Sequence, residues 1–265
     1  MKLLEHGFDL ATAEGLIDRF ALAPRDKFLQ PPNGFRREEI YPWRSDRGYS
    51  HRYRPLVLRL RDGGVDVVFG ARHIANAWRY LVMQLISDRY KANTPALKSA
   101  MGGLTKARGD IFNRYVARVI REHEGLDVRE QVKKLNVHGR THRPPGDLDV
   151  LVVDHRGKRL IALECKNIEG AHDPYAQWSE VRDLVEGDKS IVAKQRGRVA
   201  WMRANVTDVL AWLKIDTSER WRVDTAIVTS EQIPGPYLHR VNIPVVSLQE
   251  VRRMLDTTGT LSFSG

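Results

Sequence analysis

The stretch GDLDVLVVDHRGKRLIALECKN, from Gly146 to Asn167, decides the fold of this 265-residue chain. In its first part Leu148, Val150 and Val152 alternate with Asp147, Asp149 and Leu151, and its second part is an apolar run from Leu160 to Cys165 that only Glu164 interrupts. Both patterns are typical of buried strands, and the residues HRGK between them supply a turn. We therefore predict two paired strands in the core of the protein.

Charged residues interrupt this hairpin at the ends of both strands. Asp149 stands at the head of the first apolar run, and Glu164 and Lys166 flank Cys165 at the tail of the second. Because side chains in a strand alternate between faces, Glu164 and Lys166 project from the same face. Charged groups are rarely buried without partners, so the three side chains are expected to converge. Two carboxylates beside a lysine predict a site for Mg²⁺, with Mn²⁺ as a substitute.

The motif itself resembles a known signature. G-D-L-D, followed fifteen positions after Asp149 by E-C-K, resembles the PD-(D/E)xK nuclease superfamily, which has the restriction-endonuclease-like fold. Within it, the motif is similar to the branch of archaeal Holliday-junction resolvases and Mrr-type enzymes. The resemblance implies that Asp149, Glu164 and the backbone carbonyl of Cys165 bind the metal, and that Lys166 orients or activates the attacking water. The alternative is a surface hairpin with a Glu/Lys ion pair, which the apolar LIAL segment disfavours.

A second segment, RGDIFNRYVARVI, lies on a helix that we expect from Gly109 to Glu124. It also resembles the resolvase-like families, in which a glutamate directly after the aromatic residue contributes to the metal site. Here that position is Asn113, and an amide is a poorer Mg²⁺ ligand than a carboxylate. Asp110 is the alternative accessory ligand, so the number of metal ions stays open.

A third candidate group follows the hairpin, on a predicted helix from Lys189 to Leu213. The resemblance implies that basic or glutamine side chains on this helix contact the scissile phosphate. Lys194, Gln195 and Arg198 occupy the corresponding positions and are the predicted nucleic-acid contacts. A charged helix face in solvent explains them equally well.

The predicted fold class is α/β. From residue 109 onward we expect a restriction-endonuclease-like mixed-sheet core in the order αβββαββα, which the resemblance supports. Its further elements are a strand at 128–137, a helix at 174–185, strands at 223–229 and 243–246, and a helix at 247–255 capped by Ser247 and Glu250. Residues 256–265 are expected to fray. The nuclease-like domain is placed at residues 105–265.

A smaller α+β module is predicted at residues 1–92. It comprises an amphipathic helix within residues 1–30, a hairpin at 55–69, and a helix at 73–89 with Trp78 in its core face. Eight arginines between Arg36 and Arg61 are interleaved with aromatic residues, which suits phosphate contact and base stacking. Docking of a protein partner is the other interpretation, and the acidic residues Glu38, Glu39 and Asp46 favour it.

The composition limits the class of protein. With 43 Lys and Arg against 33 Asp and Glu, the chain carries a formal charge of +10, which favours a polyanionic partner. The one cysteine excludes an intrachain disulfide and a cysteine-rich zinc site, and His138 and His142 lack a third zinc ligand nearby. No segment is apolar enough to span a bilayer and no signal-peptide pattern is present, so we expect a cytoplasmic protein without a membrane partner.

These observations predict a Mg²⁺-dependent deoxyribonuclease that hydrolyses DNA phosphodiester bonds. The chain has no Walker A or G-x-G-x-x-G loop and no G-x-S-x-G elbow. The alternative is a catalytically inactive module of the same fold that binds nucleic acid or acts as a scaffold. A protein partner, additional domains or a homo-oligomer are expected, and host defence, restriction and repair all stay open.

Overall fold

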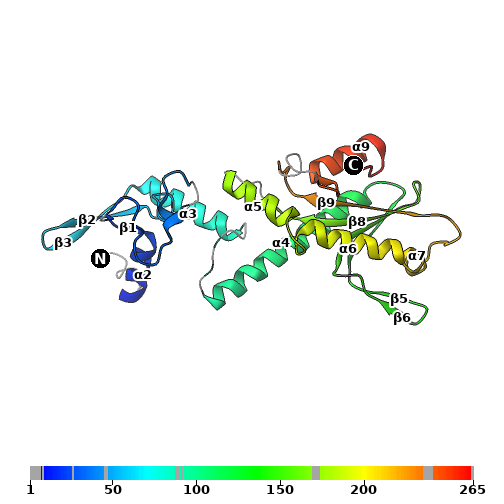
Figure 1. Ribbon diagram of the computed structural model, residues 1–265, viewed down its shortest axis with the longest axis horizontal. Coiled ribbons are helices and arrows are strands. Elements are labelled where there is room, and N and C mark those ends of the chain that lie inside the picture. The colour runs from blue at the N-terminus through cyan, green and yellow to red at the C-terminus, as the bar shows by residue number, and fades with distance from the viewer. Residues whose placement is uncertain are drawn as a thin grey trace. The chain divides into compact units, whose positions relative to one another are not determined.

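The computed structural model divides into two compact units, residues Met1–Met101 and Gly102–Gly265. It describes residues 7, 9–25, 27–44, 47–86, 90, 92, 94–168, 174–234 and 241–263, and only the backbone of 174–176 and 180. Helix α4 (Pro95–Arg121) runs through the division between the units (Figure 1). The predicted helix start at Gly109 is therefore wrong, because Gly102 and Gly103 continue this helix instead of breaking it.

The first unit contains a small sheet in the order β1-β2-β3. Strand β1 pairs in parallel with β2, and β2 pairs antiparallel with β3 through a turn at Asp62 and Gly63. The predicted hairpin at 55–69 is thus confirmed. The elements of this unit are α2 (Leu10–Phe20), β1 (Ala21–Leu22), η1 (Arg37–Ile40), β2 (Leu56–Arg61), β3 (Gly64–Val68) and α3 (Ala71–Ile86).

Helix α3 presents a different face to its unit from the one expected. Trp78 is 61% exposed, whereas the neighbouring Ala77 is buried. Successive helical residues are about 100° apart around the axis, so a contact made through Ala77 turns Trp78 towards the surface. The prediction that Trp78 belongs to the core is wrong.

Some arginines of the predicted phosphate-binding block support their own segment. Arg54 donates to the carbonyls of Asp18 and Ala21 at 2.6 and 2.7 Å, and its guanidinium lies 4.6 Å from the centre of the Phe35 ring. Arg47 donates to the carbonyl of Pro42 at 2.5 Å. These two side chains are structural, and phosphate contact by the remaining arginines stays a prediction.

The second unit is built on a five-stranded sheet in the order β10-β9-β8-β7-β4. Strands β8, β9 and β10 are parallel, and β7 pairs antiparallel with both β8 and β4. The mixed α/β class is confirmed. The elements after α4 are β4 (Leu126–Val132), β5 (Leu135–Val137), β6 (Arg140–His142), β7 (Leu148–Asp154), β8 (Arg159–Lys166), α5 (Pro174–Val185), α6 (Ile191–Ala204), α7 (Val206–Leu213), β9 (Arg222–Thr229), β10 (Val245–Ser247) and α9 (Leu248–Thr258).

Both faces of this sheet are covered by helices. Helices α4 and α9 pack on one face, where Val116 and Val251 share a cluster with Val150 of β7. Helices α6 and α7 pack on the other face, where Met202 and Val209 join Leu151. Because neither face meets water, β7 and β8 are apolar along most of their length, as the sequence predicted.

Three expected elements of this unit differ in the structure. The strand expected at 128–137 is β4 followed by the first strand of a β5–β6 hairpin, whose turn uses positive φ angles at His138 and Gly139. The helix expected at 189–213 divides into α6 and α7 at Asn205, whose side-chain amide donates to the carbonyl of Trp201 at 2.8 Å. Helix α9 extends to Thr258, and its predicted capping box of Ser247 and Glu250 is confirmed.

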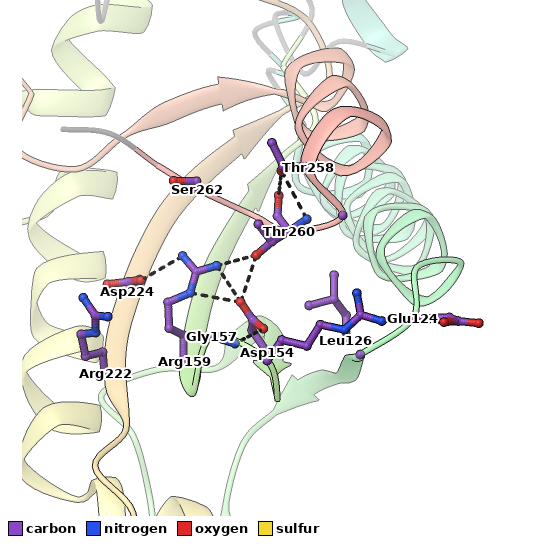
Figure 2. Close-up of a pocket in the computed structure, with 13 residues that line it drawn as sticks. Glu124, Leu126, Asp154, Gly157, Arg159, Arg222, Asp224, Thr258, Thr260 and Ser262 are labelled. Carbon is purple, nitrogen blue, oxygen red and sulfur yellow. Dashed lines mark hydrogen bonds and ion pairs between the residues drawn. The ribbon is translucent and has the colours of Figure 1, made fainter.

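The end of the described chain is held against the sheet, contrary to the expected fraying. Leu261 is fully buried in the cluster beneath α9. The hydroxyl of Thr260 donates to Asp154 Oδ2 at 3.0 Å, and Arg159 donates to the same carboxylate at 2.6 Å (Figure 2). Asp154 also accepts from the backbone N–H of Gly157 at 2.7 Å. These contacts join the β7–β8 turn to the segment after α9.

A cavity of about 530 Å³ surrounds this junction (Figure 2). It lies at the first residue of β8, Arg159, whereas Glu164 lies five residues further along the strand, roughly 17 Å away. The cavity is therefore remote from the predicted site. Among the described helices, none combines the length and apolar composition that crossing a membrane requires.

Substitution of Asp154 tests the role of this junction. Asp154→Ala removes the nearer carboxylate partner of Arg159, whose side chain is only 16% exposed, and leaves Asp224 at 3.6 Å; it is expected to lower the free energy of unfolding by about 3 kcal/mol. Urea denaturation measures the change. Glu219→Ala, which breaks the exposed pair with Lys158, serves as the matched control and should cost less than about 1 kcal/mol. Equal effects of the two substitutions would refute a structural role for the buried pair.

Candidate active site

Asp149 and Glu164 lie beside each other on neighbouring strands. The register pairs Val150 of β7 with Leu163 of β8, and one further step places Asp149 opposite Glu164. The backbone N–H of Cys165 donates to Asp149 Oδ2 at 2.9 Å, which ties the Asp149 carboxylate to β8. The sequence had predicted that these two carboxylates meet at one edge of the sheet, and the structure brings them together.

Glu164 is a buried carboxylate held between two cations. Its side chain is 4% exposed, with Lys166 Nζ at 2.8 Å from Oε1 and Arg198 Nη1 at 2.5 Å from Oε2. Lys166 follows two residues later on β8 and so projects from the same face, as the strand period predicted. Arg198 comes from α6, which covers that face. The charge of the glutamate is thus compensated on both oxygens.

Asp149 is in a different electrostatic position. Burial and the adjacent Glu164 carboxylate raise the pKa of Asp149 to about 6, against the lowering effects of the Cys165 N–H, Lys166 and Arg198. A nearby cation stabilises the charged form of such a carboxylate and so lowers its pKa. The pair therefore combines one compensated carboxylate with one that lacks a full counter-charge.

Gln195 and Arg198 have roles that differ from the predicted contact with nucleic acid. Gln195 is 1% exposed and donates to the carbonyl of Ala162 at 3.0 Å and to the hydroxyl of Thr225 at 2.8 Å. Its Oε1 accepts from Arg198 Nη1 at 3.2 Å, so it positions the arginine that pairs with Glu164. The prediction of phosphate contact is wrong for Gln195, since the side chain lies inside the core. Lys194 is exposed, and its contact with nucleic acid stays a prediction.

The pairing of Arg198 with Glu164 is the feature that sequence reasoning missed. The sequence carried a signal only for Gln195, which lies on the buried stripe of α6 with Val192, Val199 and Met202. Gly146 supports the same arrangement. Its φ of +93° favours glycine, and a Cβ there would lie 3.2 Å from Arg198 Nη2. The glycine of the G-D-L-D motif thus leaves room for this guanidinium.

Among the described residues, no contact links the predicted accessory residues Asp110 and Asn113 to Asp149 or Glu164. Asp110 Oδ1 accepts from Gln131 Nε2 at 2.8 Å. Asn113 is buried, and its Oδ1 has no hydrogen-bond partner among the described residues. The carbonyl of Cys165 stays a predicted ligand. Its thiol is buried, and burial raises the pKa of this thiol well above the ordinary value, so it is not a nucleophile.

The donor set at the sheet edge suits a hard divalent cation. Asp149 and Glu164 supply carboxylate oxygens, which Mg²⁺ prefers, and one or two carboxylates are the usual protein share of a Mg²⁺ site. Within the described residues, no cluster of three or more His, Cys, Asp and Glu side chains has the arrangement of a metal site. A cation bound by Asp149 and Glu164 would therefore take its other ligands from backbone, water and substrate.

Comparison with known proteins identifies the family of this chain. Residues 5–247 match the family model described as Upx-like, anti-phage protein Upx-like. The chain belongs to the Upx-like family. The match includes Asp149, Glu164, Lys166 and Arg198, so the whole carboxylate cluster lies inside the segment that defines membership. None of the curated proteins compared matches this chain.

Two solved structures are similar to part of the chain at low scores. Protein VC1899 from Vibrio cholerae is 14% identical with a TM-score of 0.29, and the match covers 70% of this chain but only 41% of VC1899. The type IIF restriction endonuclease Bse634I, solved with cognate DNA, is 9% identical with a TM-score of 0.28. That match covers 78% of this chain and 98% of the endonuclease. Scores this low carry no weight for function.

The raised pKa of Asp149 predicts a stability change that depends on pH. The folded-state pKa of about 6 exceeds the ordinary 3.8, so the folded protein holds an extra proton between these values and loses stability as the pH rises through this window. Asp149→Asn carries no charge at any pH. We expect it to match the wild type near pH 4 and to be more stable above pH 6, by on the order of 2 kcal/mol.

Thermal melts of both proteins across this pH range measure the difference. Asp147→Asn is the matched control, because Asp147 is exposed two residues earlier, and its difference from the wild type should stay within about 0.5 kcal/mol. If the stability difference between Asp149→Asn and the wild type is the same at pH 4 and pH 8, ionisation of Asp149 does not destabilise the folded protein.

Proposed function

We propose that this protein is a Mg²⁺-dependent endonuclease that hydrolyses DNA phosphodiester bonds, and that invading phage DNA is its substrate. The observation that supports it most is the juxtaposition of Asp149 and Glu164 at one sheet edge, with Lys166 2.8 Å from Glu164. Membership of an anti-phage family favours a target that belongs to the phage. The formal charge of +10 favours a polyanion as that target.

Each residue has a distinct part in this proposal. Asp149 and Glu164, with the Cys165 carbonyl, hold the cation, and Mn²⁺ can replace Mg²⁺. A cation bound there supplies Lewis-acid polarisation of the phosphate and of the attacking water. Lys166 donates a hydrogen bond that orients the water and offsets the negative charge that develops on the phosphoryl oxygens.

Arg198 acts through Glu164 in this scheme. Its Nη1 lies 2.5 Å from Glu164 Oε2 and is braced by Gln195, so a metal ion bound to Glu164 would share Oε1 with Lys166. Arg198 is thus a positioning residue. The restriction-endonuclease-like core order, a cytoplasmic location, and association with a protein partner or a second copy belong to the same proposal.

A catalytically inactive scaffold that binds nucleic acid is the second candidate. Both oxygens of Glu164 already pair with cations, so the charge of this glutamate is compensated without metal. Asn113 stands where the resemblance implies a glutamate ligand. In a scaffold, the ion pair of Glu164 with Arg198 would hold α6 on the sheet, and neither it nor the pair of Glu164 with Lys166 would have a part in catalysis.

Plasmid cleavage distinguishes the two candidates. The wild type is expected to nick supercoiled DNA in Mg²⁺ or Mn²⁺ and to be inert in EDTA. Asp149→Asn and Glu164→Gln should each lower the rate by roughly 100-fold or more, equivalent to about 2.7 kcal/mol of transition-state stabilisation. DNA binding in EDTA should not weaken, because each substitution removes a negative charge.

Glu219→Gln removes a carboxylate that is half exposed and remote from the site, and it should cleave at the wild-type rate. An inert wild type with intact DNA binding would establish the scaffold instead. Full activity of Glu164→Gln would show that the cation is not held at this carboxylate.

A further inference from the structure

The β5–β6 hairpin projects from the sheet of the second unit (Figure 1). It leaves β4 at Val132 and returns to β7 at Leu148, and these two residues form the last pair of the β4–β7 ladder. Asp149 is the next residue of β7, so the hairpin and the carboxylate site lie at the same edge of the sheet. The sequence had predicted residues 135–137 as the end of a longer strand, and not as the first strand of a hairpin.

The inner face of the hairpin is anchored. Leu135 and Val137 are 1% and 5% exposed and pack in one cluster with Val209 and Leu210 of α7. His142 Nδ1 lies 3.5 Å from Asp208 Oδ2, also on α7. The two-residue turn has φ of 48° at His138 and 76° at Gly139, which is the positive-φ pattern of a type I′ turn. The hairpin therefore has a fixed orientation.

The outer face is polar and exposed. Asn136 pairs with Thr141 across the hairpin, and the Thr141 hydroxyl donates to Asn136 Oδ1 at 3.0 Å. Burial alternates strictly from Lys134 to Val137 and again from Thr141 to Arg143, so Lys134 and Arg143 extend this outer face beyond the strands. The face thus presents a lysine, an amide, a hydroxyl and an arginine.

The charge of the segment is uniformly positive. Residues 133–146 contain four basic residues and no Asp or Glu, so the formal charge is +4 with histidines neutral. Lys133 lies 3.7 Å from Asp147, just outside this range, in an exposed pair. Lys134 and Arg143, which lie on the outer face, are not members of that ion pair.

A two-stranded ribbon of this kind fits the major groove of duplex DNA, which is about 12 Å wide. Continued along the strands, the register places Lys134 opposite Arg143, nearer the sheet than Asn136 and Thr141, where the two basic side chains suit phosphate contacts. The Asn136 and Thr141 side chains, nearer the turn, suit the edges of bases. We propose that the outer face of the β5–β6 hairpin binds duplex DNA beside the carboxylate site, with Lys134 and Arg143 on the phosphates. The proposal rests on the proposed nuclease function for the nature of the polyanion.

The test measures binding of the full chain to a fluorescent DNA duplex in EDTA, by anisotropy at several salt concentrations. Lys134→Gln with Arg143→Gln is expected to weaken binding and to reduce the slope of log affinity against log salt by roughly 1.8, or 0.9 per lost phosphate contact. Arg220→Gln with Arg222→Gln is the matched control. Both control residues are exposed, and Arg222 lies opposite Arg159 at the far end of β8. Their slope should equal that of the wild type.

An unchanged slope in the hairpin variant would overturn the proposal, as would an equal loss in the control variant. A loss seen with duplex RNA and not with duplex DNA would also overturn it, because the deep, narrow major groove of A-form RNA does not admit the ribbon. Asn136→Ala with Thr141→Ala provides a second variant of the same face, and its effect should depend on the DNA sequence. Equal thermal melts of all variants establish that each is folded.

The two proposals can fail separately. If the wild type cleaves DNA and the hairpin variant keeps the wild-type salt slope, only the hairpin proposal fails. If the wild type cleaves no DNA but the hairpin variant has a reduced salt slope, the nuclease proposal fails and the DNA-binding surface stands.

Discussion

The second unit depends on one buried charge, the carboxylate of Glu164 near the end of β8. A buried carboxylate is tolerated only with partners, and Lys166 and Arg198 supply them on its two oxygens. This requirement fixes Arg198, and through it Gln195 and the position of α6 on the sheet. It also accounts for Gly146, because a larger residue would crowd the Arg198 guanidinium. The charge at the strand end thus organises a helix and a loop that are remote from it in sequence.

The same charge links fold and function. Apolar strands covered on both faces form a rigid frame, and the polar cluster interrupts this frame at one edge of the sheet. The β5–β6 hairpin leaves the sheet at that edge, so a positively charged ribbon stands beside two carboxylates. The proposed polyanion binding and metal-assisted hydrolysis rest on this combination, and the chain belongs to the Upx-like family, described as anti-phage.

The hairpin at the centre of the fold was predictable because its signals are local. Alternation, a four-residue turn and the spacing of Glu164 and Lys166 determine which side chains share a face. The partner of Glu164 was not predictable in the same way, since Arg198 is 34 residues away and only the packing of α6 brings it close. The β5–β6 turn escaped detection because His138-Gly139 lacks the common Asn-Gly signal for positive φ. Helix α4 was cut short in the prediction because two adjacent glycines favour a break, which the rest of the helix overrides.

The proposed function requires a divalent cation between Asp149 and Glu164. A crystal of the protein soaked in Mn²⁺ tests this directly, through the anomalous difference density of the metal. We expect one strong peak within about 2.5 Å of a carboxylate oxygen of each residue, a distance typical of hard cations. A peak elsewhere, or density at this edge that shows only the Lys166 and Arg198 contacts with Glu164, would contradict it.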